Sequence, residues 1–186
     1  MKKSLKRKPV LPDLVCDTSS IQYLHQVGLL YILHELGQDI FIPPAVKHEL
    51  AVGLEHGVDL PDLERTDWIK MICPQGGKST RLLTDMGPGE AEVMLLALEN
   101  DGLVAVLDDS LARTRAHILN IPFTGTLGLL LDAKKIGLIR SVGPVLDTLI
   151  ALQFRLATHT REMILRKAGE LSEGESFEPE TKNFCP

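Results

Sequence analysis

The chain has 186 residues, of which 44% are hydrophobic and 24% charged, and its net charge at pH 7 is −5. This length suits a single domain with a sizeable core, and the negative charge argues against a protein that wraps nucleic acid in a basic surface. The longest apolar runs, such as Val93–Leu98, are far shorter than the roughly 20 residues that cross a bilayer. We therefore expect a cytoplasmic protein that has no membrane partner.

The first part of the chain combines a strand with a broken helix. Val10–Cys16 is an apolar run in which Pro12 delays regular strand pairing until about Leu14. From Ile21 to Leu36, apolar residues recur at helical spacing and are interrupted at Gly28. This pattern predicts a helix, a kink and a second helix.

A second strand and helix follow directly. Ile40–Ile42 is a short apolar strand, and the prolines at 43 and 44 open a helix that extends to about Leu54, because proline favours the first helical turn. Gly53–Thr66 is expected to be a loop with one short helical turn. Trp68–Cys73 is predicted to be another strand, and the segment 74–80 a flexible connection.

The remaining elements repeat this alternation. Gly87–Gly89 is a breaker, and the helix at Glu90–Asn100 carries its acids in the first turn. Val104–Asp109 is a buried strand that ends in two aspartates. The other predicted elements are helices at Ser110–Leu119, Gly125–Lys135, Val142–Leu156 and Thr160–Ala168, and a strand at Ile121–Phe123. Strands alternating with helices predict an α/β fold with a doubly wound, mostly parallel central sheet flanked by helices.

Acidic side chains gather where the predicted strands end and the following helices begin. In a parallel sheet these positions share one edge, so the side chains are expected to meet there. Their placement requires an explanation, because burying an unpaired carboxylate is costly unless it is protonated, paired with a base or bound to a cation. The acids at this edge are Asp17, Glu49, Glu90, Glu92, Asp108 and Asp109.

Each of these acids also has a purely structural explanation. Asp17 could cap the next helix, although the three hydroxyl residues after it could do the same. Glu90 and Glu92 could complement the dipole of their helix, and one of the two adjacent aspartates could cap the helix that they precede. Glu49 lies in mid-helix beside Lys47. The joint pattern is therefore more informative than any single residue.

Carboxylates without histidine or cysteine select hard cations such as Mg²⁺ or Mn²⁺. Such ions support phosphodiester hydrolysis by activating water and by neutralising charge on the leaving oxygen. The three cysteines, at positions 16, 73 and 185, are widely spaced, and neither a disulfide framework nor a zinc site is expected. The sequence thus predicts metal-assisted cleavage of a phosphoryl bond.

Five stretches, in this order and spacing, resemble the PIN-domain superfamily, and most closely a small prokaryotic PIN-like family first described as a domain of unknown function. The resemblance extends from about Leu14 to Glu170. The stretches are VCDTSSIQYL (15–24), IPPAVKHEL (42–50), GPGEAEVMLLALE (87–99), LDDSLARTRA (107–116) and TGTLGLLLDAKKIGLI (124–139). The resemblance implies an α/β/α sandwich with the activity of a Mg²⁺- or Mn²⁺-dependent endoribonuclease on single-stranded RNA.

The resemblance also assigns roles to individual residues. Asp17 matches the first acid of the family, with Ser19 as the nearby hydroxyl, and Glu49 matches the second acid. Glu92 occupies the position of an aspartate in most PIN domains, and its side chain is one methylene longer. Two further matches complete the set: Asp109 is the final acid with Asp108 beside it, and Glu90 is an additional acid of the subfamily.

Our main hypothesis is therefore an RNA-cleaving nuclease. The expected catalytic residues are Asp17, Glu49, Glu92 and Asp109; the expected metal ligands are Asp17, Glu90, Glu92, Asp108 and Asp109; and Ser19, Arg113 and Arg115 are expected to contact substrate. In an alternative interpretation the two arginines pair with the acids. The rival functions are a catalytically silent PIN-like module that binds RNA or protein, and a phosphohydrolase with Asp17 as nucleophile. The absence of a second aspartate counts against the phosphohydrolase, because residue 19 is a serine.

The resemblance has implications for organisation and partners as well. Such proteins are frequently toxins of toxin–antitoxin pairs, so a small antitoxin protein is an expected partner. They also commonly dimerise, so a homodimer is expected. Residues 10–170 are predicted to form the domain, followed by a frayed polar tail at 171–186. Residues 1–9, with five lysines or arginines, are predicted to form a disordered basic arm, either solvated or in contact with RNA.

Overall fold

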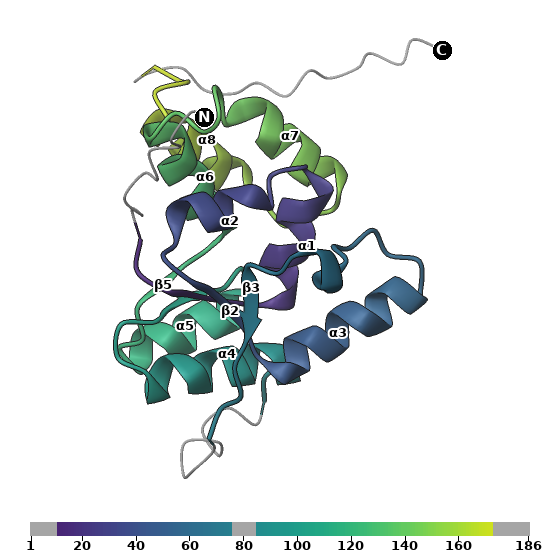
Figure 1. Cartoon of the computed structure of the whole chain (residues 1–186). Helices are drawn as coiled ribbons and strands as arrows, with labels where there is room; N and C mark the ends of the chain where they lie inside the picture. The colour runs from purple at the N-terminus through teal and green to yellow at the C-terminus, as the bar shows by residue number, and fades with distance from the viewer. Residues whose placement is uncertain (1–10, 76–84, 173–186) are drawn as a thin grey trace, which may run out of the picture.

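The computed structural model describes residues 11–75 and 85–172 (Figure 1). The predicted basic arm, most of the connection at 74–80 and the tail beyond residue 172 lie outside the described residues. The predicted domain boundaries therefore stay predictions.

A parallel sheet forms the centre of the fold. Every neighbouring pair of strands in it is parallel, and the strand order is β3-β2-β1-β4-β5. The strands are β1 (Leu14–Cys16), β2 (Ile40–Ile42), β3 (Ile69–Met71), β4 (Val104–Val106) and β5 (Phe123–Thr124). The sheet grows in one direction from β1 and in the other from β4, so the topological switch point lies between these two strands. The predicted doubly wound sheet is confirmed.

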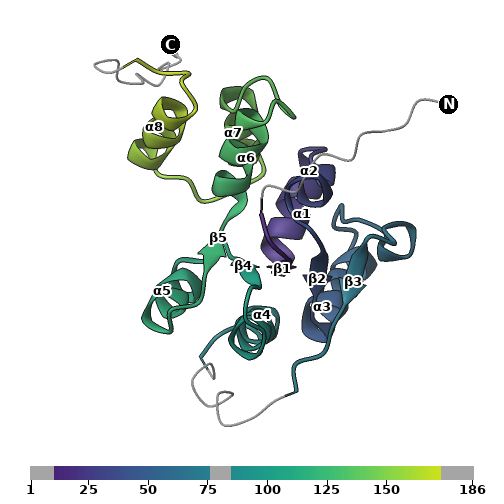
Figure 2. The same ribbon diagram turned by 60° about the vertical axis from the view of Figure 1, so that its left-hand side comes forward.

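Helices cover both faces of this sheet. In Figures 1 and 2, α4 and α5 lie on one face, and α1, α2 and α6 lie on the other, with α7 and α8 beyond α6. The helix bounds are α1 (Thr18–Gln26), α2 (Tyr31–Leu36), α3 (Pro44–Glu55), α4 (Pro88–Glu99), α5 (Ser110–Ile118), α6 (Thr126–Lys135), α7 (Gly143–Ala151) and α8 (Thr158–Lys167). A 3₁₀ turn at Leu63–Arg65 provides the short helical turn predicted before β3.

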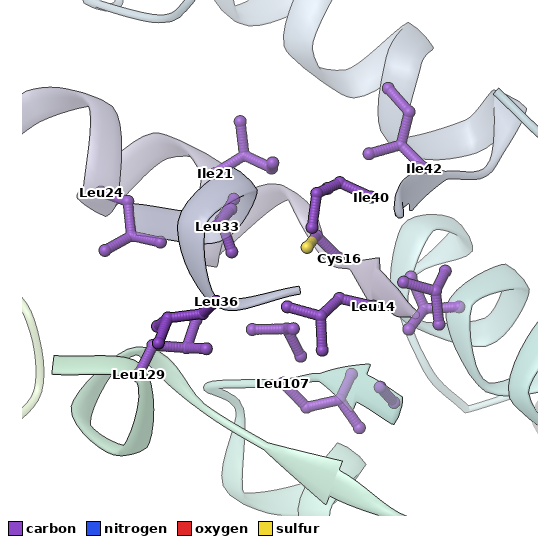
Figure 3. Close-up of a cluster of buried hydrophobic side chains, with 14 of the residues drawn as sticks. Leu14, Cys16, Ile21, Leu24, Leu33, Leu36, Ile40, Ile42, Leu107 and Leu129 are labelled. Atoms are coloured by element: carbon purple, nitrogen blue, oxygen red, sulfur yellow. The ribbon is translucent and has the colours of Figure 1, made fainter. Parts of the chain in front are cut away.

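The core surrounds β1, the middle strand of the sheet. Leu14, Val15 and Cys16 are completely buried, as expected for a strand that is covered on both faces. Figure 3 shows Leu14 and Cys16 with aliphatic residues of neighbouring elements, such as Leu36 of α2 and Leu129 of α6. Burial of this strand fixes the position of the residue that follows it, Asp17.

Several helix starts differ from the predictions because of capping. The first helix begins at Thr18 rather than Ile21, since Asp17 is its N-cap. The α4 helix begins at Pro88 rather than Glu90, since Gly87 is the N-cap and most of the predicted breaker forms the first turn. The predicted break at Gly28 is confirmed, with φ +71° between α1 and α2.

Other differences concern the short C-terminal elements. The β5 strand begins at Phe123 rather than Ile121, because the Ile121 N–H bonds to the Ala116 carbonyl and closes the end of α5. The α7 helix ends at Ala151 rather than Leu156, since Gln153 adopts φ +66°. Within the described ranges, no helix has the combination of length and hydrophobicity that crossing a membrane requires.

Candidate active site

Two aspartates meet at the topological switch point. Asp17 directly follows β1, and Asp108 follows the adjacent strand β4 after one intervening residue. The Asp108 backbone N–H donates to Asp17 Oδ2 at 3.3 Å, and the Ser20 N–H donates to Oδ1 at 2.8 Å. Asp17 is only 1% exposed. Parallel pairing of β1 with β4 is thus what brings the two carboxyl groups together.

The environment of this pair disfavours two negative charges. Burial raises the pKa of Asp17 to about 7, and the neighbouring carboxylate of Asp108 adds to the increase. Burial also raises the pKa of Asp108, although hydrogen bonds from Thr126 and the positive charge of Arg113 act in the opposite direction. The pair therefore favours a proton or a cation.

Asp108 is held in place by the start of α6. Its Oδ1 accepts the Thr126 N–H at 2.9 Å, and its Oδ2 accepts the Thr126 hydroxyl at 2.5 Å. Gly125 makes this approach possible, because a Cβ there would lie 2.9 Å from Asp108 Oδ1 and equally close to the Leu107 carbonyl oxygen. The glycine before α6 therefore has a direct role in placing an acid.

Asp109 faces solvent and caps α5. Its Oδ1 accepts two backbone N–H groups, from Leu111 at 2.7 Å and from Ala112 at 3.0 Å. Of the two adjacent aspartates, Asp109 is thus the one that caps the helix at Ser110, as one alternative predicted.

Glu90 and Glu49 extend the acidic group toward α3. Burial raises the pKa of Glu90, and the charges of Asp109 and, to a smaller extent, Glu49 raise it further, while a hydrogen bond from the Gly87 backbone opposes them. Glu49 accepts the Gly89 N–H at 2.9 Å and also the hydroxyl proton of Thr18. A Cβ at Gly89 would lie 2.5 Å from Glu49 Oε2, so only glycine allows this contact.

Glu92 makes its hydrogen bond with α3. Its Oε2 accepts the Ala45 N–H at 2.8 Å in the first turn of α3, which begins at two prolines and has no side-chain cap of its own. Glu49 of α3 reciprocally accepts an N–H in the first turn of α4. The two helices therefore cap each other, and Glu92, unlike Glu90 of the same helix, does not line the cleft that Asp108 and Asp109 border.

The hydrogen bond between the Ala45 N–H and Glu92 leads to a testable prediction. We expect Glu92→Ala to lower the free energy of unfolding by about 1 kcal/mol, because the Ala45 N–H loses a charged acceptor at a helix start. Urea unfolding measures the change. Glu35→Ala, at an exposed position on α2, is the control and should cost much less. Equal effects of the two variants would contradict the capping role.

All six predicted acids accept a backbone N–H at the start of a helix. The helices are α1, α3, α4, α5 and α6, whose N-termini follow parallel strands and so lie at the same edge of the sheet. The positive ends of the helix dipoles stabilise carboxylates there. In the described part of the chain, no three Asp, Glu, His or Cys side chains are grouped closely enough to hold an ion together. Each acid instead accepts a backbone N–H at a helix start, and for Glu49, Glu92 and Asp108 that helix is a different one from the helix that carries or directly follows the acid.

A cleft of about 460 Å³ opens beside three of these acids, Glu90, Asp108 and Asp109. Its lining residues are Ser19, Tyr23, Glu90, Asp108, Asp109, Ser110, Gln153, Phe154 and Arg155. The acids and Ser19 were predicted from the sequence, whereas residues 153–155 were not. These come from the connection between α7 and α8, and only the packing of the C-terminal helices brings them to the sheet edge.

The predicted arginines occupy different environments. Arg113 lies over the Phe123 ring, 5.5 Å from its centroid, and its charge offsets part of the rise that burial causes in the pKa of Asp108. Arg115 forms an ion pair with Asp85, which is outside the predicted set of acids. Of the two, Arg113 is therefore the one placed beside the acidic pair.

Comparison with known proteins identifies one family. A family model described as a PIN domain matches residues 13–170, which covers nearly all of the described chain. No curated protein matches the chain.

Proposed function

The chain belongs to the PIN-domain family, whose members are generally nucleases, and from this membership we propose that it is a divalent-metal-dependent endoribonuclease. Its proposed reaction is hydrolysis of phosphodiester bonds in single-stranded RNA. The observation that carries the proposal is the buried Asp17–Asp108 pair, which needs positive charge and lies at the switch point, where open α/β sheets bind ligands.

The acids suit a hard divalent cation. PIN domains typically use divalent metal ions, and every candidate donor here is a carboxylate oxygen, which is the ligand type that Mg²⁺ and Mn²⁺ prefer. The raised pKa of Asp17 supports the fit, since a cation would neutralise a charge that burial disfavours. We propose Asp17 and Asp108 as the first ligands, with Glu90, Glu92 and Asp109 as the further members of the set.

Once bound, such an ion would supply an activated water and neutralise charge on the phosphate. The other roles fall to the protein. Ser19 lines the cleft and would donate a hydrogen bond to substrate, while Glu49 fixes the start of α4, from which Glu90 extends. Arg113 would bind a phosphate group of the RNA, and Arg115 would join it after separating from Asp85.

Cleavage of labelled RNA tests the proposal. We expect the purified protein to cut a single-stranded RNA with Mn²⁺ or Mg²⁺ and to leave it intact in EDTA, with a matching RNA duplex cut more slowly. The double variant Asp17→Asn/Asp108→Asn, purified in the same way, should be inactive, which excludes a contaminating nuclease. Absence of metal-dependent cleavage by the native protein would refute the proposed activity.

One observation favours a second candidate function. Because all six acids accept N–H groups at helix starts, they could also serve as an internal network in a catalytically silent module that binds RNA or protein. Such a module would bind single-stranded RNA equally well with Mn²⁺ and with EDTA and would never cut it. The cleavage experiment separates the two functions.

The biological setting is a further part of the proposal. We propose that the nuclease is the toxin of a toxin–antitoxin pair, bound by a small antitoxin protein, and that it forms a homodimer. Membership of the PIN-domain family supports the first of these ideas, since PIN nucleases commonly bind RNA and can pair with antitoxins. A small reading frame next to the coding region and the mass of the protein in solution would test them.

A further inference from the structure

The connection between α7 and α8 has a well-defined backbone. After the last residue of α7, the Gln153 N–H bonds to the Ile150 carbonyl at 3.0 Å, and the Phe154 N–H bonds to the Leu149 carbonyl at 2.9 Å. With Gln153 at φ +66°, these two bonds form a Schellman motif. Residues 153–155 are thus held by the end of a helix, and Figure 2 shows the connection running below α6 on the side of the sheet.

Phe154 forms part of an aromatic wall beside the acids. Its ring packs edge-on against Tyr23 of α1, with 4.9 Å between the centroids and 83° between the planes. Both rings line the same cleft as Asp108 and Glu90, and both are only half-buried. Aromatic side chains bordering a polar cleft are suited to stacking with an unpaired base.

Arg155 brings a second cation to this place. Arg155 and Arg113, on α5, both line a cavity of about 340 Å³ that also includes Asp108 and Phe154. Within residues 11–75 and 85–172, Arg155 has no ion pair or hydrogen bond of its own, and its side chain is exposed. Two separate elements therefore direct guanidinium groups at one cavity next to the acids.

This arrangement resolves a conflict of charge. The chain has a net charge of −5, and its cleft is rich in carboxylates, so a polyanion would be repelled unless cations lay beside them. Guanidinium groups bind phosphate through paired N–H donors and keep their charge at every physiological pH. Arg113 and Arg155 supply positive charge in the cavity that they share with Asp108.

We propose that the α7–α8 connection is a nucleotide subsite, in which Arg155 and Arg113 bind a backbone phosphate and Phe154 stacks with an unpaired base. The inference rests on the proposed nuclease function and deepens it, because it explains a preference for single strands. The bases of a duplex are stacked on each other and are not available to the Phe154 ring. Arg155 and Phe154 are then positioning residues that hold the strand across the acids.

Binding measured without cleavage tests the subsite. The probe is a fluorescein-labelled octamer of adenosine ribonucleotides, titrated in EDTA and followed by fluorescence anisotropy at several salt concentrations. We expect Arg155→Met to weaken binding roughly tenfold and to reduce the slope of log K against log salt by about 0.7, the loss of one phosphate contact. Phe154→Leu should weaken binding roughly tenfold with the salt slope unchanged and should lose the preference over a duplex.

The control is Arg140→Met, which removes an exposed arginine that lines neither cavity. It should leave affinity and salt slope close to those of the native protein. Equal effects of Arg140→Met and Arg155→Met would overturn the subsite, because they would indicate charge alone. So would unchanged binding by both Arg155→Met and Phe154→Leu.

These results separate the subsite from the activity. If the native protein cuts RNA with Mn²⁺ but Arg155→Met binds and cuts normally, the nuclease function stands and the subsite is wrong. If the native protein never cuts RNA but its binding depends on Arg155 and Phe154, the subsite stands and the nuclease function is wrong.

Discussion

The Asp17→Asn variant is expected to be more stable than the native protein by about 1–3 kcal/mol at pH 8 in EDTA. Asp17 is 1% exposed, and its pKa is raised from 3.8 to about 7 by burial and by Asp108. A shift of this size corresponds to about 4 kcal/mol. Asparagine keeps the cap of α1 but accepts poorly from the Asp108 N–H, which returns about 1 kcal/mol or more of that gain.

The effect has a defined pH dependence. A carboxyl group whose folded pKa is raised stabilises the native state fully below its unfolded pKa, here near 4, and this contribution is lost as the pH rises through the folded pKa of about 7. The native protein should therefore lose stability between pH 4 and 7 through this group. Asp17→Asn should lose less over the same range, so the difference between the two proteins grows with pH.

Urea unfolding at pH 5, 6, 7 and 8 measures this difference. Asp101→Asn, at an exposed turn after α4, is the matched control and should follow the native curve. If Asp17→Asn were less stable than the native protein at pH 8, the carboxylate would have to be well compensated in the fold. Its burial next to Asp108 would then give no reason for a cation at this place.

Much of the fold was accessible from the sequence because its signals are local. The helix that opens at the two prolines before Ala45 and the break at Gly28 follow from backbone chemistry that few residues share. The parallel sheet follows from the alternation of apolar runs and helical spacing. What the sequence missed was mainly the first turn of helices, where capping by Asp17 and Gly87 decides the start.

Part of the candidate site could likewise be predicted from the sequence, and the rest depends on how the helices pack. Asp17 and Asp108 follow paired strands, so the strand order alone brings them together. The direction of Glu92 could not be predicted, because it depends on how α4 packs beside α3 and on an N–H left uncapped there. Arg155 had no sequence signal, since its approach to Asp108 depends on the packing of α7 and α8.

The two adjacent aspartates provide the other large effect. We expect Asp108→Asn to reduce metal-dependent RNA cleavage at least about a hundredfold, because residues that merely support metal ligands already contribute roughly 10–100-fold. Its carboxylate lies beside Asp17 and is held by Thr126, so the proposed ion would lose one of its first ligands. Cleavage rates at saturating Mn²⁺ and the Mn²⁺ concentration for half-maximal rate measure the loss.

Asp109→Asn separates charge from capping at the neighbouring position. Asparagine is as good an N-cap as aspartate, so the bonds from Leu111 and Ala112 should be kept and stability should change by less than about 0.5 kcal/mol. If Asp109 is a metal ligand, as its match to the final acid of the family implies, cleavage should still fall about as far as in Asp108→Asn. Full activity with unchanged stability would show that Asp109 only caps α5, and that Asp108 is the acid that β4 contributes to the site.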